Sequence, residues 1–156
     1  MKKVALLTLS HTLALTLGFG LGIYALPILI APEGPANSEL KSLQGEARYR
    51  TEFRRDVKGS DLLHWGEGAV SVDAKRVALQ GKLSPGPDYK LYLVPRFVDT
   101  KEEFLKVKTT ALRVGDIKTF ENFVVDLPPN TDIDKFNTVL VWCETFSMFI
   151  SAAKYR

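Results

Sequence analysis

An uncharged stretch at the amino terminus constrains this chain more than any other feature. Residues 4–31 contain no Asp, Glu, Lys or Arg, and Lys2 and Lys3 stand immediately before them. The core of a signal peptide spans roughly 7–15 apolar residues, whereas a helix that crosses a membrane needs about 20. Residues 1–31 are therefore predicted to form an uncleaved signal anchor, that is, one transmembrane helix.

A cleaved signal peptide is the weaker alternative. Signal peptidase requires small residues before the cut, but Ala31 is followed by Pro32, and Ile23-Tyr24-Ala25 has no small residue at its first position. The two lysines should remain in the cytoplasm by the positive-inside tendency. The rest of the chain is then predicted to lie outside the cytoplasm.

The remainder divides into a linker and one domain. Residues 32–44 (PEGPANSELKSLQ) are rich in proline and small polar residues and are predicted to form a linker that ends in a helical turn. Residues 45–156 contain short apolar runs of period two, such as YKLYLVP and TVLVWC, separated by turn sequences such as SPGPD and PPNTD. This pattern predicts an all-β fold, an antiparallel β-sandwich or barrel-like domain. One short helix is expected at Thr100–Lys108, with Thr100 as its N-cap.

Composition excludes some classes of protein. The chain is 46% hydrophobic and 25% charged, which is ordinary for a globular protein and argues against intrinsic disorder. Without Lys2 and Lys3, the 21 basic residues fall to 19 against 18 acidic ones, and they form no basic stripe. A nucleic-acid partner is not expected, because such a surface concentrates positive charge.

The predicted domain contains one histidine, His64, and one cysteine, Cys143. A structural zinc site needs four Cys or His ligands, and covalent haem attachment needs CxxCH, so neither is predicted. The sequence also lacks HExxH, GxSxG and GxxxxGK[ST], which argues against several hydrolase and nucleotide-binding classes. Two candidate segments remain, LHWGEGAVSV around His64 and VWCETF around Cys143.

Two interpretations of Cys143 are open from the residues alone. In a strand through Thr138–Cys143, Leu140 and Trp142 share one face, and Val139, Val141 and Cys143 share the other. Both faces are apolar, which predicts a central strand with Cys143 buried near its end. Such a cysteine is often only a core residue. A lone thiol outside the cytoplasm, however, must be shielded, paired between molecules or used.

These segments resemble the electron-transfer DM-thirteen domain, over about residues 45–156. The most specific part is the stretch Val141-Trp142-Cys143 followed by Phe146, and the second marker is His64 upstream of Gly68. The resemblance implies a small all-β extracytoplasmic module with a redox role, in which the cysteine is the proposed active residue. Bacterial members also occur behind a single N-terminal helix, which implies a single-pass protein of the bacterial cytoplasmic membrane with a periplasmic domain.

The resulting hypothesis is a membrane-anchored domain with an electron-transfer role centred on Cys143, acting as a thiolate or soft ligand. His64 would be a second ligand or would tune the thiol, which requires contact within about 3–4 Å. Trp142 would shield the site. No cofactor, metal or electron partner is identified by the sequence, although a redox or binding partner in the cell envelope is expected. The alternatives are a non-catalytic module that binds a ligand or protein, and an assembly factor that docks through the anchor helix.

Overall fold

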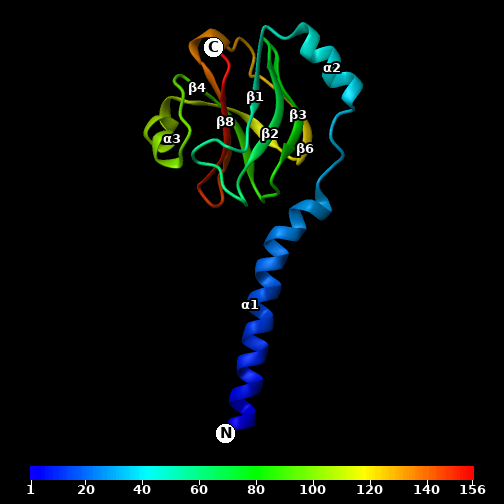
Figure 1. Cartoon of the computed structure of the whole chain (residues 1–156), viewed down its shortest axis with the longest axis vertical. Coiled ribbons are helices and arrows are strands. Elements are labelled where there is room, and N and C mark those ends of the chain that lie inside the picture. The colour runs from blue at the N-terminus through cyan, green and yellow to red at the C-terminus, as the bar shows by residue number, and fades with distance from the viewer.

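A computed structural model describes residues 1–156, in which a long helix leads into a two-sheet domain (Figure 1). The helices are α1 (Lys2–Ile30), α2 (Asn37–Glu46) and α3 (Lys101–Val107), with 3-10 turns η1 (Lys108–Thr110) and η2 (Ile133–Lys135). The strands are β1 (Tyr49–Phe53), β2 (Gly66–Val72), β3 (Arg76–Leu83), β4 (Tyr89–Val94), β5 (Leu112–Ile117), β6 (Glu121–Asp126), β7 (Thr138–Cys143) and β8 (Met148–Lys154).

The eight strands form two antiparallel sheets of four strands each. The first sheet has the order β1-β2-β3-β6 and the second has the order β5-β4-β7-β8. The two sheets pack face to face, because the inward residues of both share one apolar cluster. The predicted antiparallel β-sandwich behind one N-terminal apolar helix is confirmed.

The main core lies between the sheets. The first sheet contributes Val70 and Leu79, and the second contributes Leu91 and Val139, all at most 1 % exposed. Strand β7 is buried along its whole length, since it lies between β4 and β8 and is covered on both faces. This double burial explains why its sequence is continuously apolar rather than alternating.

Two short helices cover the outer faces of the sandwich. Helix α3 lies over the second sheet, where Phe104 packs on Trp142 with ring centroids 4.9 Å apart. Thr100 is the N-cap of α3, and its side chain accepts a hydrogen bond from the backbone N–H of Glu103 at 3.3 Å. The predicted short helix and its cap are therefore confirmed.

Helix α2 covers the first sheet. Its Leu40 and Leu43 are 1 % and 8 % exposed and pack against Ala78 of β3. Most of this helix falls in residues 32–44, the segment predicted to be a linker. These residues therefore do more than connect, because they bury part of the outer face of the domain.

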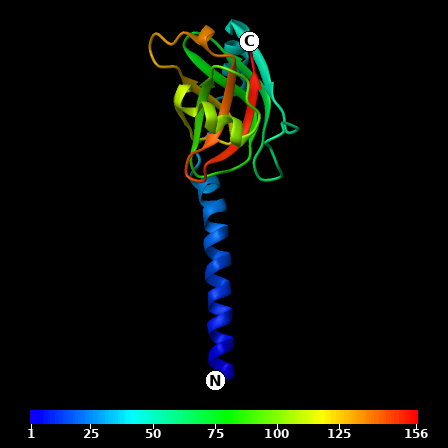
Figure 2. The ribbon, with the colours of Figure 1, turned by 90° about the vertical axis from the view of Figure 1, so that its left-hand side faces the viewer.

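Helix α1 extends away from the domain as a rod (Figures 1 and 2). None of its residues is buried, although its side chains are almost all apolar. It is long and apolar enough to cross a membrane, and an N-terminal signal sequence meets the same criterion. Its carboxyl end lies against one end of the sandwich, here called the α1 end. The β1–β2, β3–β4, β5–β6 and β7–β8 connections gather there.

Candidate functional site

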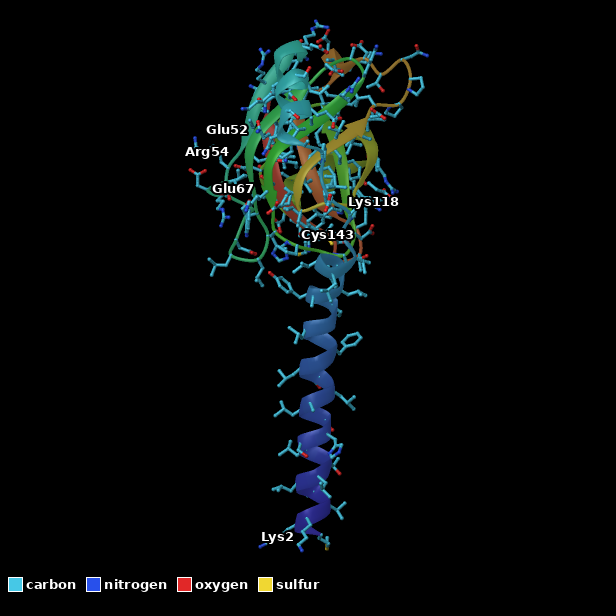
Figure 3. All side chains as sticks on the ribbon, turned by 90° about the vertical axis from the view of Figure 1, so that its right-hand side faces the viewer. Lys2, Glu52, Arg54, Glu67, Lys118 and Cys143 are labelled. Atoms are coloured by element: carbon cyan, nitrogen blue, oxygen red, sulfur yellow. The ribbon has the colours of Figure 1, made fainter.

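Cys143 is the last residue of β7 and lies at the α1 end of the domain (Figure 3). It is 2 % exposed and pairs with Tyr89 of β4 and Met148 of β8. Its side chain belongs to the core between the sheets, together with Val139 and Val141. The prediction of a buried cysteine at the end of a central strand is confirmed.

A cavity of about 140 Å³ opens beside this cysteine and is here called the Cys143 pocket. Five connections and elements supply its walls, which are α1, the β1–β2 loop, the β3–β4 loop, the β7–β8 turn and strands of the second sheet. Its lining residues are Ile23, Tyr24, Leu63, His64, Pro85, Gly86, Pro87, Tyr89, Cys143, Phe146 and Ile150. Pockets for whole small molecules usually measure about 300–1,000 Å³, so this one suits a small group or the end of a larger molecule.

The β1–β2 loop carries His64 to the pocket because it is fixed on both sides of this residue. Before His64, in the middle of the loop, the Ser60 hydroxyl donates to the carbonyl of Ile150 at 3.0 Å. Near its end, the backbone N–H of Trp65 donates to the Ser84 hydroxyl at 3.1 Å, and the N–H of Ser84 donates to the carbonyl of Trp65 at 2.9 Å. These bonds tie the loop to β8 and to the β3–β4 loop, which both reach the pocket.

Asp61 orients His64. Its carboxylate lies 2.9 Å from His64 Nδ1 and accepts hydrogen bonds from the backbone N–H groups of Leu63 and His64 at 2.7 and 2.8 Å. Partial burial opposes ionisation of Asp61, but these hydrogen bonds prevail and lower the pKa of its carboxyl. An ionised Asp61 assigns the proton to Nδ1, which leaves Nε2 as the nitrogen available to a ligand.

The Cys143 thiol lies in a surrounding that favours its neutral form. Burial raises the pKa of the thiol, and backbone N–H groups of Phe146 and Asp88 oppose the shift only in part. The Asp88 carboxylate adds to the increase by charge repulsion. Cysteines with depressed pKa usually lie beside a cation, and here no Lys or Arg lines the pocket.

Tyr89 supplies the other polar group of the pocket. Its hydroxyl lies 3.4 Å from the Ser84 hydroxyl, and burial raises its pKa, so the phenol stays protonated. Gly86 permits this arrangement, because a Cβ at that position would lie 2.5 Å from the Tyr89 ring. Sequence reasoning missed Tyr89, although its cross-strand pairing with Cys143 follows from the register of β4 and β7. It also missed Asp61, whose only signal is its position three residues before His64.

The structure brings two of the three predicted site residues together. His64 and Cys143 line the same pocket. The hydrogen bonds of the His64 ring nitrogen Nδ1 go to Asp61 and not to the thiol. An approach of His64 to Cys143 within about 3–4 Å stays a prediction.

Trp142, the third predicted residue, lies elsewhere. It faces the opposite side of the second sheet, where it packs with Tyr92 and Phe104 beneath α3, and it does not line the pocket. Its indole Nε1 is buried without a hydrogen-bond partner. Leu63 and Phe146 are apolar side chains that line the pocket, where Trp142 was expected to shield the site.

Glu144 follows Cys143 and ties the β7–β8 turn to the second sheet. Its carboxylate accepts hydrogen bonds from the Tyr92 hydroxyl and from Lys108 Nζ, the latter at 2.6 Å. Burial opposes ionisation of Glu144, but these two donors lower its pKa. The chain therefore leaves the pocket in a fixed direction after Cys143, which holds Phe146 at the pocket wall.

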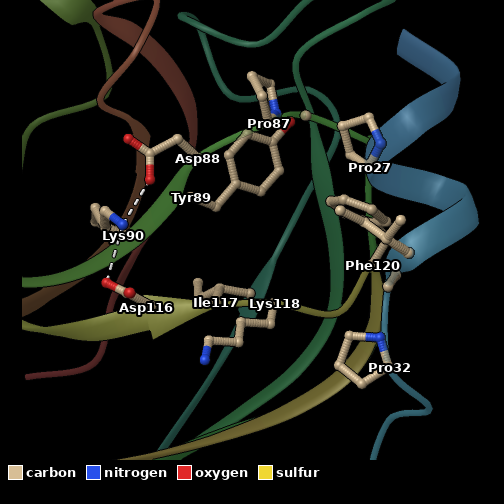
Figure 4. Close-up of a pocket in the computed structure, with 13 residues that line it drawn as sticks. Pro27, Pro32, Pro87, Asp88, Tyr89, Lys90, Asp116, Ile117, Lys118 and Phe120 are labelled. Atoms are coloured by element: carbon tan, nitrogen blue, oxygen red, sulfur yellow. Dashed lines mark ion pairs between the residues drawn. The ribbon is translucent and has the colours of Figure 1, made fainter. Parts of the chain in front are cut away.

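A second cavity, of about 280 Å³, lies between α1 and the domain (Figure 4). Pro27 and Pro32 face Tyr89 and Phe120 across it. On its other side, Lys90 Nζ pairs with Asp88 at 2.5 Å and with Asp116 at 2.9 Å. Because Lys90 is neutralised by two carboxylates, it is not a free cation for the Cys143 pocket.

The structure contains no group of three or more His, Cys, Asp or Glu residues that would hold a metal ion. Cys143 and His64 are two donors, and protein metal centres generally use three or four. A complete metal site from this chain alone is therefore not formed. The pocket brings together one thiol, one imidazole and one phenol, those of Cys143, His64 and Tyr89.

Comparison with known proteins gives one match. No curated protein and no solved structure matches the chain. A family model described as electron transfer DM13 matches residues 52–155, which include Asp61, His64, Tyr89 and Cys143 and begin inside β1. The match covers both sheets of the sandwich and suggests a redox-related role. The chain belongs to the electron transfer DM13 family.

Proposed function

We propose that this protein is a membrane-anchored electron-transfer domain of the cell envelope and that the Cys143 pocket is its redox site. One observation carries the proposal. The single thiol and the single imidazole of the domain are far apart in sequence, yet both line one pocket within the region that the family model matches. Electron transfer here is thiol-based and uses Cys143 as the reacting group.

The proposed step is thiol–disulfide exchange with a disulfide of an envelope protein or small molecule. His64 Nε2 accepts the proton of the Cys143 thiol, directly or through one water, and the thiolate attacks one sulfur of the disulfide. The disulfide S–S bond breaks and a mixed disulfide forms at Cys143. The departing sulfur leaves with the electron pair and takes the proton from the imidazolium. A dithiol of a second envelope partner then attacks the Cys143 sulfur and releases the first partner as a thiol, and its second thiol releases Cys143 as a thiol. Two electrons thus pass from the dithiol, which becomes a disulfide, to the first disulfide, which becomes two thiols.

Asp61 supports this step from behind the imidazole. Its ionised carboxylate holds Nδ1–H and stabilises the positive charge that His64 gains when it accepts the thiol proton. The raised pKa of Cys143 keeps the thiol neutral until a disulfide is bound. The resting site is then protected from unspecific oxidation, because the thiolate is the reactive form.

The cellular address is part of the same proposal. Helix α1 acts as the anchor, Lys2 and Lys3 stay in the cytoplasm, and the domain lies on the periplasmic side of a bacterial membrane. The length and apolar composition of α1 support an anchor. Carbonate extraction of membranes tests it, since an integral helix stays with the bilayer. Mature protein that begins near Ala36 in the soluble periplasmic fraction would refute the anchor.

A binding module remains the second candidate, and two observations favour it. Seven of the 11 residues that line the pocket are hydrophobic, and burial raises the pKa of the thiol. In that case Cys143 packs the core and the pocket holds an apolar group of a ligand or partner without chemistry. The assembly-factor alternative, which docks through α1, has no supporting observation in the domain.

Mixed-disulfide formation distinguishes redox chemistry from binding. The purified full chain is incubated with a small aromatic disulfide at pH 7, and the mass added at Cys143 is followed with time. We expect an adduct in the native protein and a loss of rate in His64→Gln on the order of tenfold to a hundredfold, because the general base is removed. Lys75→Gln, in the distant β2–β3 turn, is the control. An adduct that forms only after denaturation, or equal rates in His64→Gln and the native chain, would favour the binding module.

A further inference from the structure

The position of α1 fixes how deep the α1 end of the domain lies, once the helix is placed in a bilayer. About 20 residues cross the hydrocarbon region, so a span that starts after Lys3 reaches the far interface near Ile23. Tyr24 follows, and tyrosine is typical of the interfacial belt. Ile23 and Tyr24 both line the Cys143 pocket of the domain. The mouth of the pocket is therefore level with the interface and not above it.

The loops at this level expose large apolar side chains. Leu62 is 95 % exposed, Leu63 is 64 % exposed and Phe146 is 49 % exposed. Leu63 and Phe146 line the Cys143 pocket with Ile23 and Tyr24, and Leu62 neighbours Leu63 on the β1–β2 loop. Leu62, Leu63 and Phe146 are here called the apolar rim. Exposed apolar residues that cluster on one edge mark an interaction surface.

We propose that the apolar rim inserts into the outer interface of the same bilayer that α1 spans. The rim is continuous with the apolar surface of α1, so the bilayer that covers one also covers the other. The interfacial layer accommodates the Asp61 carboxylate, since that layer contains water and lipid headgroups. This inference rests on the anchoring part of the proposed function and does not depend on thiol chemistry.

Insertion of the rim has a consequence for the site. The Cys143 pocket then opens toward the lipid headgroups, between α1 and the two loops that bear the rim. A reaction partner reaches the thiol along the membrane surface, as the exposed arm of a membrane protein or as an amphiphile. A soluble protein that approaches from the opposite end of the sandwich finds no route to Cys143.

Site-directed spin labelling tests the insertion. In a full chain that carries Cys143→Ala, single cysteines are placed by Leu62→Cys in the rim, Leu15→Cys in α1 and Ala74→Cys in the exposed β2–β3 turn at the opposite end. Each protein is labelled with a nitroxide in vesicles of phosphatidylethanolamine and phosphatidylglycerol. Collision with oxygen, which partitions into lipid, is compared with collision with a water-soluble nickel chelate. The quantity compared is the ratio of the oxygen collision rate to the nickel collision rate. We expect this ratio at position 62 to lie several-fold above the ratio at position 74 and below the ratio at position 15.

The three probes separate the possible failures. A high, lipid-like collision ratio at position 15 together with equal, low ratios at positions 62 and 74 overturns the rim insertion. That result would still support α1 as a membrane anchor. Water-like signals at all three positions overturn both. Should Cys143→Ala fail to fold, Leu62→Trp in the otherwise native chain replaces the label. Lipids with brominated tails are then expected to quench the tryptophan fluorescence of Leu62→Trp more strongly than that of the unsubstituted chain. Equal quenching of the two proteins overturns the insertion.

Discussion

The carboxylate of Asp61 lies 2.9 Å from His64 Nδ1 and also accepts the backbone N–H of His64 at 2.8 Å. One side chain thus fixes both the backbone and the ring of the histidine. Because the lowered pKa of Asp61 keeps its carboxylate ionised at neutral pH, His64 presents Nε2 to the pocket.

Asp61→Asn tests this positioning. Asparagine keeps an oxygen that accepts from the backbone N–H groups, but it removes the negative charge that stabilises a protonated imidazole. We expect thiol–disulfide exchange at Cys143 to slow by on the order of tenfold while the free energy of unfolding changes little. Exchange rate and denaturant midpoint are measured on the same samples, with Asp56→Asn on the same loop as the control. An unchanged exchange rate in Asp61→Asn would mean that the carboxylate serves the loop only.

The raised pKa of Cys143 predicts how the thiol responds to pH. Alkylation of the native protein should increase with pH along a curve whose midpoint lies above the ordinary thiol pKa of about 8.5. The folded state holds the thiol proton more tightly than the unfolded state. The contribution of Cys143 to the free energy of unfolding is therefore complete at pH values below the pKa of this thiol in the unfolded chain. It is lost as pH rises from there through the folded pKa. This loss of stability at high pH should be absent in Cys143→Ala. An alkylation midpoint below about 8 would contradict the conclusion that burial raises the pKa of the thiol.

Cys143→Ala separates packing from chemistry. The side chain is 2 % exposed in the main core, so its truncation should lower the free energy of unfolding by about 1–2 kcal/mol. If the proposed function is right, redox activity is abolished in this variant. Met148→Ala, at the paired position of β8, is a control for the packing loss without loss of the thiol. Retained activity in Cys143→Ala would leave Cys143 as a core residue.

The strand pattern could be predicted because one physical rule governs it. Alternation with period two placed Val139 and Val141 on one face of β7 and Leu140 on the other, and their burial in separate clusters follows. The same alternation places Trp142 on the face away from Cys143. A shielding role for Trp142 was therefore in conflict with the predicted strand itself.

The site could be predicted only in part, because its geometry depends on loops. His64 reaches the pocket through hydrogen bonds that join distant loops, such as Ser60 to Ile150 and Trp65 to Ser84. Such bonds leave no periodic signal in the sequence. The same is true of α2, where only two apolar residues, Leu40 and Leu43, face the sheet and the flanking prolines resemble those of a linker.

The packing of α2 predicts where a stable soluble fragment begins. Residues 37–156 should be more stable than residues 45–156, because the longer fragment keeps Leu40 and Leu43 on the first sheet. Burial of each leucine contributes roughly 1.5–3 kcal/mol, which ordering of the helix offsets in part, so we expect a difference of about 2 kcal/mol. Urea unfolding measures it. Leu40→Ala in the longer fragment should reproduce most of the loss and Lys41→Ala should not, whereas equal stability of the two fragments would contradict a packing role for α2.

Gly68 of β2 predicts a further effect on stability. Its φ is 126°, a conformation that residues with a Cβ rarely adopt, and it lies opposite Gly81 of β3. A Cβ at this position would lie 2.4 Å from the carbonyl oxygen of Gln80 and 2.5 Å from the Cα of Gly81. Because these contacts are backbone atoms within a paired sheet, neither strand can yield without losing hydrogen bonds.

Gly68→Ala is therefore expected to lower the free energy of unfolding by about 2–3 kcal/mol, from backbone strain together with the steric contact. Gly45→Ala is the matched control, since its Cβ would meet nothing within 4 Å and its helical position in α2 favours alanine. Denaturant unfolding of residues 37–156 compares the two variants. The strain also bears on the site, because β2 begins directly after the loop that carries His64. Relaxation of the strand in Gly68→Ala should slow exchange at Cys143 even where the protein remains folded, and an exchange rate equal to that of Gly45→Ala would show that β2 does not position His64.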